Sequence, residues 1–283
     1  MRFAVVGSRG LLGAELARFL NESGREVVGF DRSNIDIHVL APEELVEKLV
    51  GFDVVVNAAA FTRVDDAETK IFEANAVNAI AAGKLAQASA LVGARFIQVS
   101  TDYVFSGVSS APYLTSDAID PQTEYGRSKA LGELLVSESG ADYAIIRTAW
   151  LYGSTGKCFP KTIANALERN GSARVVDDQH GQPTWTRDLA ELIVACAELS
   201  EMPRILHGTS SGVATWSEFA GEVARSLGLD PVEVVVPITS AEYATVAVRP
   251  KWSVLDNSGG LLEPIGDWRE RWRIAADEVL ASR

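Results

Sequence analysis

The chain has 283 residues, which is long enough for one large domain or two unequal ones. Its 47% hydrophobic and 23% charged residues are typical of a globular protein, and no apolar run approaches the roughly 20 residues of a membrane-spanning helix. The formal net charge of −12 argues against nucleic-acid binding, and the strand-like start and only two cysteines, Cys158 and Cys196, predict a cytoplasmic protein.

The first predicted element is a buried strand at 2–6, which a glycine-rich turn and a helix follow. Strand, glycine turn and helix are the context that a dinucleotide-binding fingerprint requires. Gly7 permits the tight turn, Gly10 lets the backbone approach a pyrophosphate, and Gly13 lets the helix pack on the strand. The pyrophosphate is then held by free N–H groups at the start of the helix. The residues predicted to bind the dinucleotide in this segment are Gly7, Arg9, Gly10, Leu11, Leu12 and Gly13.

The second predicted strand, 27–30, ends in Asp31 at the interval expected of a carboxylate that binds the adenosine ribose. Asp31 favours NAD. Arg32 directly after it, and Arg9 in the glycine turn, could instead hold a 2′-phosphate and favour NADP. The two signals conflict, so the prediction is a nicotinamide dinucleotide, NADH or NADPH.

The next predicted elements alternate between strand and helix. Strands are predicted at 53–57, 95–99 and 142–149, and helices at about 65–91 and 125–139. This order predicts an α/β fold, a Rossmann-like doubly wound parallel sheet.

Prolines and glycines, Pro160 among them, become frequent after about residue 150, and helices are predicted at 187–199, 216–227 and 267–281. We therefore expect a dinucleotide-binding domain at 1–150, to which parts of the later chain can return. We expect residues 151–283 to form a smaller, irregular α/β portion that mainly binds substrate.

Several polar residues and glycines fall at the carboxyl ends of predicted strands, where ligands bind in such sheets. Gly7, Asp31, Asn57 and Thr101 all lie at or just past these ends, which predicts an active site there. The residues that follow Asn57 are expected both to pack on the sheet and to face the cofactor; they are Ala58, Ala59 and Ala60.

Tyr125 and Lys129 are four residues apart, so on a helix they share one face. A phenol titrates near ~10 and is a poor acid at neutral pH. A nearby ammonium favours the phenolate, which predicts a lowered pKa for Tyr125 and a role as general acid toward an oxygen that gains charge. Thr101 can present its hydroxyl to the same oxygen.

Taken together, these residues resemble the extended short-chain dehydrogenases/reductases that act on nucleotide sugars, and within them the dTDP-4-dehydrorhamnose reductase family. The resemblance covers nearly the whole chain. The motifs that carry it include Gly7-x-x-Gly10-x-x-Gly13, Asn57-Ala-Ala-Ala60, Ser100-Thr-Asp-Tyr-Val-Phe105, Tyr125-Gly-x-x-Lys129-x-x-Gly132-Glu133, Arg147-Thr-x-Trp150, Asp178-Gln179-x-Gly181 and Arg249-Pro250.

The resemblance implies a reaction and further site residues. It implies that a hydride reduces the C4 carbonyl of a dTDP-4-keto-6-deoxysugar, while Tyr125 donates a proton and Lys129 tunes Tyr125 and holds the nicotinamide ribose. Asp36 and Ile37 match the part of the family that flanks the adenine. The residues expected to shape the substrate site are Thr101, Asp102, Tyr103 and Trp150, although Trp150 could equally be a core aromatic. Gln179 and Arg249 are further candidates; Gln179 could instead satisfy loop backbone, and Arg249 could be a surface residue before a proline turn. Trp216 and Trp252 are expected in the core.

The sequence leaves alternatives open for a metal site, for the oligomeric state and for the function. Some relatives dimerise through magnesium, and Glu15, Asp188 and Glu278 lie at similar places, but the spacing does not support a metal site. A monomer or a homodimer is expected, with no nucleic-acid or membrane partner. The alternatives to the rhamnose enzyme are another nucleotide-sugar 4-ketoreductase and a non-catalytic, dinucleotide-binding regulatory subunit.

Overall fold

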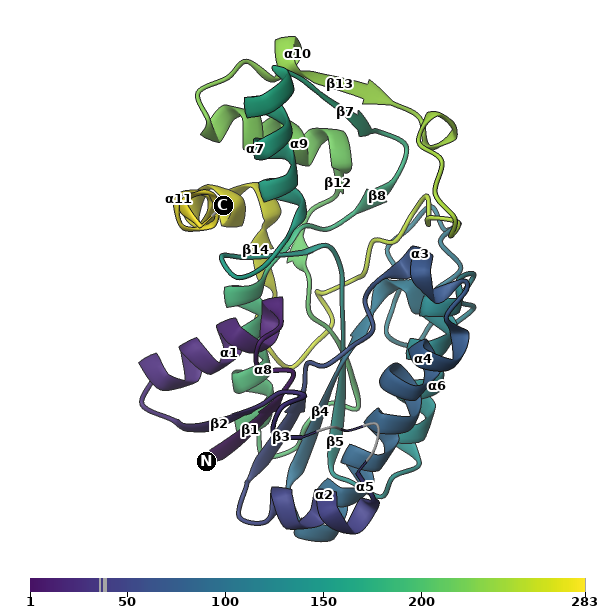
Figure 1. Ribbon diagram of the computed structural model, residues 1–283, viewed down its shortest axis with the longest axis vertical. Helices are drawn as coiled ribbons and strands as arrows, with labels where there is room; N and C mark the ends of the chain where they lie inside the picture. The colour runs from purple at the N-terminus through teal and green to yellow at the C-terminus, as the bar shows by residue number, and fades with distance from the viewer. Residues whose placement is uncertain (36, 38–39, 283) are drawn as a thin grey trace.

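The computed structural model describes residues 1–35, 37 and 40–282, so Asp36 lies outside the described residues. Its centre is a six-stranded, fully parallel sheet with the strand order β10-β5-β4-β3-β1-β2 (Figure 1). The strands of this sheet are β1 (Arg2–Val6), β2 (Glu26–Phe30), β3 (Val54–Asn57), β4 (Arg95–Thr101), β5 (Tyr143–Thr148) and β10 (Ile205–His207). The predicted Rossmann-like, doubly wound fold is confirmed, and the strand order reverses between β1 and β3.

Helices cover both faces of the sheet because both faces of its central strands are apolar. Phe3 and Val5 of β1 pack with α1 and α8 on one face, and Ala4 and Val6 pack with α2 and α5 on the other. The helices up to residue 137 are α1 (Leu11–Glu22), α2 (Pro42–Leu49), α3 (Val64–Ala67), α4 (Ile71–Asn75), the π-helix η1 (Ala76–Ile80), α5 (Ala81–Val92), the 3-10 helix η2 (Asp102–Val104) and α6 (Glu124–Ser137).

The single helix predicted at 65–91 is wrong in detail, because the segment divides into α3, α4, η1 and α5. The hydroxyl of Thr69 donates to the Asp66 carbonyl at 3.2 Å, which offers the backbone a local alternative to the helix. Further along, Asn78 lies in the π-helical turn η1, and its buried side-chain amide accepts from the N–H of Phe61 and donates to the Phe61 carbonyl. A π-helical turn inside a helix is frequent at functional sites.

The later part of the chain forms small strand pairs and a second helical layer beyond the carboxyl ends of the sheet strands (Figure 1). Its strand pairs are β6 (Leu151–Tyr152) with β9 (Thr184–Trp185), β7 (Ala173–Val176) with β13 (Val235–Ile238), β8 (His180–Gly181) with β12 (Ala214–Thr215), and β11 (Ser210–Ser211) with β14 (Ile265–Asp267). Its helices are α7 (Phe159–Asn170), α8 (Thr186–Glu198), α9 (Trp216–Ser226), α10 (Pro231–Val234), the 3-10 helix η3 (Ser240–Glu242) and α11 (Trp268–Ala281).

Parts of this later chain return to the N-terminal sheet. β10 extends the sheet beside β5, and α8 packs on α1. A core of its own, with Trp268 and Trp272 fully buried, joins α7, α9 and α11. The division at residue 150 stays a prediction.

Helix α7 has no counterpart among the predicted helices. Pro160 is one of the residues that predict irregular chain, but it occupies the first turn of α7, where a missing N–H removes no helical hydrogen bond. Among the described residues, no helix is both long and apolar enough to cross a membrane.

Candidate active site

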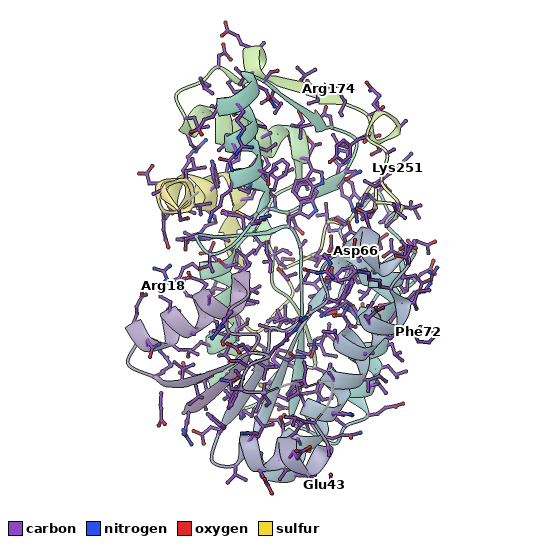
Figure 2. All side chains as sticks on the ribbon, viewed as in Figure 1. Arg18, Glu43, Asp66, Phe72, Arg174 and Lys251 are labelled. Carbon is purple, nitrogen blue, oxygen red and sulfur yellow. The ribbon has the colours of Figure 1, made fainter. Side chains whose placement is uncertain are left out.

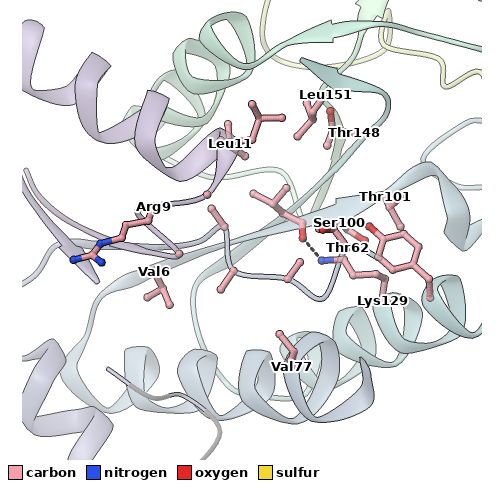
Figure 3. Close-up of a pocket in the computed structure, with 18 of the residues that line it drawn as sticks. Val6, Arg9, Leu11, Thr62, Val77, Ser100, Thr101, Lys129, Thr148 and Leu151 are labelled. Atoms are coloured by element: carbon pink, nitrogen blue, oxygen red, sulfur yellow. Dashed lines mark hydrogen bonds between the residues drawn. The ribbon is translucent and has the colours of Figure 1, made fainter. Parts of the chain in front are cut away.

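A cavity of about 900 Å³ opens at the carboxyl end of the sheet, where the strand order reverses. This is the position at which doubly wound sheets bind their ligands. Figure 3 shows the cavity between the glycine turn and the helix that carries Lys129. The predicted site residues that line it are Gly7, Arg9, Gly10, Leu11, Leu12, Asp31, Arg32, Ile37, Ala58, Ala59, Ala60, Thr101, Asp102, Tyr103, Tyr125, Lys129 and Trp150.

The glycine turn has the tight geometry that its sequence predicts. Gly7 has a φ of +86°, and a side chain there would lie 2.6 Å from the backbone nitrogen of Ala59. A Cβ on Gly13 would lie 2.2 Å from the Gly7 carbonyl oxygen, so Gly13 packs against the turn and does not line the cavity. Gly10 caps α1 without a side-chain hydrogen bond, which leaves first-turn N–H groups available for a phosphate.

Charged residues lie at the end of the cavity next to β2. Asp31 pairs with Arg9 at 2.5 Å, and hydrogen bonds from Ser33 lower the pKa of the Asp31 carboxyl. Arg32 lines the cavity beside them. A carboxylate for a ribose hydroxyl and two guanidinium groups for a phosphate are therefore all within this end of the cavity.

Thr101, Tyr125 and Lys129 meet at the end of β4 and the start of α6. Thr123 begins α6 by accepting a hydrogen bond from the Gly126 N–H at 3.0 Å, which fixes where Tyr125 enters the cavity. The Thr101 hydroxyl lies near the phenol of Tyr125 and favours the ionised form of that phenol. Figure 3 shows Thr101 and Lys129 on one side of the cavity, and Tyr125, near Thr101, lines the same cavity.

The protonation of this group differs from the expected one. Burial raises the pKa of Tyr125 far above its usual value, and the Lys129 ammonium does not offset it. Lys129 instead donates to the Val99 carbonyl at 2.6 Å, and burial lowers its pKa to about 8. Tyr125 is therefore a protonated phenol at neutral pH, the form from which a general acid donates.

Asp102 is a buried carboxyl group in the same cavity wall, with 3% of its surface exposed. Burial raises the pKa of Asp102 to about 6, against the opposing effect of the Ser253 and Thr101 hydroxyls. Thr101 donates to Oδ1 at 2.8 Å, whereas Oδ2 has no hydrogen-bond partner within the described chain. A buried carboxylate oxygen without a protein donor is suited to a ligand hydroxyl.

A buried ion pair lies next to β4, the strand that ends in Thr101. Arg147 binds Glu133 through two hydrogen bonds of 3.0 and 2.7 Å, and Ser100 donates to the same carboxylate at 2.5 Å. These residues come from β5, α6 and β4, so the pair joins the elements that carry Thr101 and Tyr125. The sequence alone predicts no role for Arg147, Glu133 or Ser100, because a buried ion pair cannot be distinguished from surface charges before the fold is known.

Among the lining residues that the sequence did not predict, Trp216 and Lys157 carry large aromatic or charged side chains. Trp216, expected in the core, stacks on Trp150 with ring centroids 3.5 Å apart, and Lys157 lies in the loop before α7. No local pattern marks either residue.

Gln179 and Arg249 do not line this cavity. The Gln179 amide donates to Ser240 at 2.9 Å, and Arg249 pairs with Asp65 at 2.6 Å. Arg249 lines a smaller neighbouring cavity of about 360 Å³, which also reaches Tyr103.

The carboxylates considered for magnesium face guanidinium groups instead. Arg18, labelled on α1 in Figure 2, binds both Glu15 and Glu278 at 2.8 Å, and Arg271 binds Asp188 at 2.5 Å. Within the described chain, no group of three or more metal-ligating side chains could hold an ion. These residues do not fit a magnesium ion, because their charges are already matched by arginines.

The doubly wound sheet, the glycine turn and the Tyr-x-x-x-Lys helix define a short-chain dehydrogenase/reductase, an oxidoreductase that uses a nicotinamide dinucleotide. Residues 1–283 match the family described as "RmlD substrate binding domain", and the chain belongs to this family.

Named relatives agree with this assignment over nearly their whole lengths. The chain is 42% identical to a dTDP-4-dehydrorhamnose reductase of Streptomyces griseus, over 95% of this chain and 90% of that one. It is 40% identical to a probable dTDP-4,6-dihydroxy-2-methyloxan-3-one 4-ketoreductase of Streptomyces antibioticus, over 100% of this chain and 97% of that one. A solved structure of a dTDP-4-dehydrorhamnose reductase of Bacillus anthracis, in complex with NADP, is 32% identical and has a TM-score of 0.92. The match covers 98% of this chain and 99% of that one.

Proposed function

We propose that this protein reduces the C4 keto group of a dTDP-4-keto-6-deoxyhexose with NADH or NADPH, and that dTDP-4-dehydrorhamnose is its main substrate. The product is then dTDP-L-rhamnose. The observation that carries the proposal is the convergence of Thr101, Tyr125 and Lys129 on the cavity that begins at the glycine turn. The names of the full-length relatives support the substrate class.

The chain's own residues provide the proton chemistry. Asp31, Arg9 and Arg32 at one end of the cavity and Lys129 at the other would hold a reduced nicotinamide dinucleotide, which would supply the hydride for C4. Tyr125 donates its phenolic proton to the alkoxide that forms, and the nearby Thr101 hydroxyl contacts the same oxygen. Lys129 places a positive charge where negative charge develops, and donors fixed in advance stabilise such a transition state.

The test is product identification with both cofactors. The protein is incubated with dTDP-4-dehydrorhamnose and NADH or NADPH, cofactor oxidation is followed by absorbance, and the product is identified by NMR. Tyr125→Phe should lower kcat/KM by about 10²–10⁴-fold, because it removes the general acid, while the affinity for cofactor stays unchanged. Tyr143→Phe is the matched control. Tyr143 begins β5, whereas Thr148 at the other end of this strand lines the cavity, so the change should leave kcat/KM unchanged.

Other outcomes would point to the alternatives. Turnover that yields a different deoxysugar would assign another nucleotide-sugar 4-ketoreductase, a class represented among the relatives. Cofactor binding without oxidation of any dTDP-4-keto sugar would contradict the enzyme and favour a non-catalytic regulatory subunit. The protein is proposed to act in the cytoplasm as a monomer or homodimer.

A further inference from the structure

Two indole rings from distant segments form one wall of the cavity. Trp150 follows β5 and Trp216 begins α9, and their rings lie nearly parallel, 8° apart in plane. Phe159 also packs against Trp216, with ring centroids 4.6 Å apart. Both indoles are only partly buried and line the cavity. Aromatic surface held rigid and left open to a cavity is suited to bind a ligand.

The backbone of Trp150 is held in an unfavourable conformation. Its φ of 47° is the only positive φ among the described non-glycine residues. A bulky residue pays for this conformation, and such strain clusters at ligand-binding sites. Gly181 makes room for the indole, because a Cβ there would lie 2.5 Å from the Trp150 ring. Contacts with Trp216 and Gly181 therefore fix the position of the Trp150 ring.

The strand register places this wall next to the reacting centre. Thr101 of β4 is paired with Thr148 of β5, and Trp150 follows two residues later. A sugar whose carbonyl contacts Thr101 and Tyr125 must therefore extend along Trp150. Its ring carries apolar C–H groups and a C6 methyl that can pack against indole surface.

A cation lies where the next part of the substrate must go. Lys157 is exposed, lines the cavity, and lies two residues before Phe159, which touches Trp216. The other cationic residues that line the cavity are Arg9 and Arg32 at the β2 end and Lys129 beside the catalytic tyrosine. In a chain with a net charge of −12, a substrate diphosphate needs a cation placed locally.

We propose that Trp216 and Lys157 are substrate-binding residues: the stacked Trp150 and Trp216 hold the sugar ring, and Lys157 binds the diphosphate. This inference rests on the proposed function for its substrate class. It assigns the order Tyr125, Trp150, Trp216 and Lys157 along the bound nucleotide sugar, so specificity for the sugar depends on the later part of the chain.

Two ligands separate the two roles. The affinities for dTDP and for dTDP-L-rhamnose are measured by titration calorimetry. Trp216→Ala should weaken dTDP-L-rhamnose binding by about 5- to 100-fold, as expected when one stacking partner is lost, and dTDP binding by less than about 2-fold. Lys157→Gln should weaken both ligands by about 5- to 20-fold and reduce the salt dependence of binding, because it removes one charge contact. Lys157→Arg should retain most of the affinity.

Two control variants test whether the affinity changes are specific, and a circular dichroism spectrum tests the stacking of the indoles. Trp252→Ala and Lys48→Gln remove the same residue types outside the cavity lining and should leave both affinities unchanged. The stacked indoles should give an exciton couplet in the circular dichroism spectrum, which Trp216→Phe abolishes while the protein stays folded. KM for the sugar should rise in Trp216→Ala with a smaller change in kcat, and KM for the cofactor should not move.

Equal weakening of dTDP and dTDP-L-rhamnose by Trp216→Ala would overturn the sugar contact, and unchanged affinities in Lys157→Gln would overturn the diphosphate contact. Failure of the proposed function gives a different result, because the wild-type protein would then oxidise no cofactor with the keto sugar. The ratio of variant to wild-type affinity for the nucleotide sugar tests the inference without any turnover.

Discussion

The two sides of the cavity are built in different ways. The proposed catalytic side, called the catalytic side below, takes Thr101, Tyr125 and Lys129 from β4 and α6, which pack directly on one another. The polar groups of Thr101 and Lys129 are buried and bonded, as in the 2.6 Å contact from Lys129 to Val99. The opposite wall takes its indoles from segments far apart in sequence and holds them by ring stacking.

The difference separates the demands of reaction and recognition. Proton donation needs the donor and acceptor atoms to lie within a few tenths of an ångström of the positions that the reaction requires. Short hydrogen bonds between neighbouring elements provide this precision. Recognition of a sugar ring needs a surface of the right shape, and stacked rings provide it with fewer fixed bonds. Changes on the catalytic side should therefore affect stability and rate together, and changes in the wall should mainly affect affinity.

The strongest test of the catalytic side is to break its buried ion pair. Glu133→Ala leaves Arg147 charged and unpaired at 3% exposure, so it should lower the free energy of unfolding by about 3–5 kcal/mol. Urea unfolding measures this change. The exposed pair of Arg2 with Glu26 is the control, and Glu26→Ala should cost less than about 1 kcal/mol. Similar small losses in both variants would show that the catalytic side does not depend on this pair.

A second test asks what the buried Asp102 carboxyl costs. Its pKa of about 6 in the folded protein is higher than the ordinary 3.8, so the folded state binds the proton more tightly. Stability therefore falls as the pH rises between these values, and the full cost, at most roughly 3 kcal/mol, is present above about pH 6. Asp102→Asn should raise the free energy of unfolding at pH 7 but not at pH 3.5.

Urea unfolding at the two pH values measures this effect, with the exposed Asp277→Asn on α11 as the control. Asp102→Asn should also lower the affinity for the nucleotide sugar if its unpaired oxygen receives a sugar hydroxyl. A stability gain of equal size at both pH values would show that burial of the charge is not its cause.

The residues of the catalytic side could be predicted because their signals are local. Gly7 with its strand and helix, and Tyr125 with Lys129 one turn later, are patterns within short segments. The pKa of Tyr125 could not be predicted in direction, because it depends on burial by residues from several elements. The sequence pattern suggested only the neighbouring ammonium.

The wall could not be predicted for a related reason. Trp216 has the same local sequence signature as a core tryptophan at the start of a helix, and its partner Trp150 lies far away in the chain. Lys157 is one charged loop residue among many. The addition of β10 to the sheet likewise depends on pairing between residues distant in sequence, which periodicity does not encode.

The smallest expected effect is a pH dependence that tests whether Lys129 acts as a cation. Burial lowers the pKa of Lys129 to about 8, so the ammonium is present below this pH and is lost as the pH rises through it. The raised pKa of Tyr125 keeps the phenol protonated over the same range. We expect kcat/KM to fall by about half between pH 7 and 8 and by about tenfold per pH unit above about pH 9. Lys129→Arg keeps its charge at every accessible pH, so its lower activity should show no decline above pH 8. If Lys129→Arg shows the same decline as the wild-type protein, another group titrates and the charge of Lys129 does not limit the reaction.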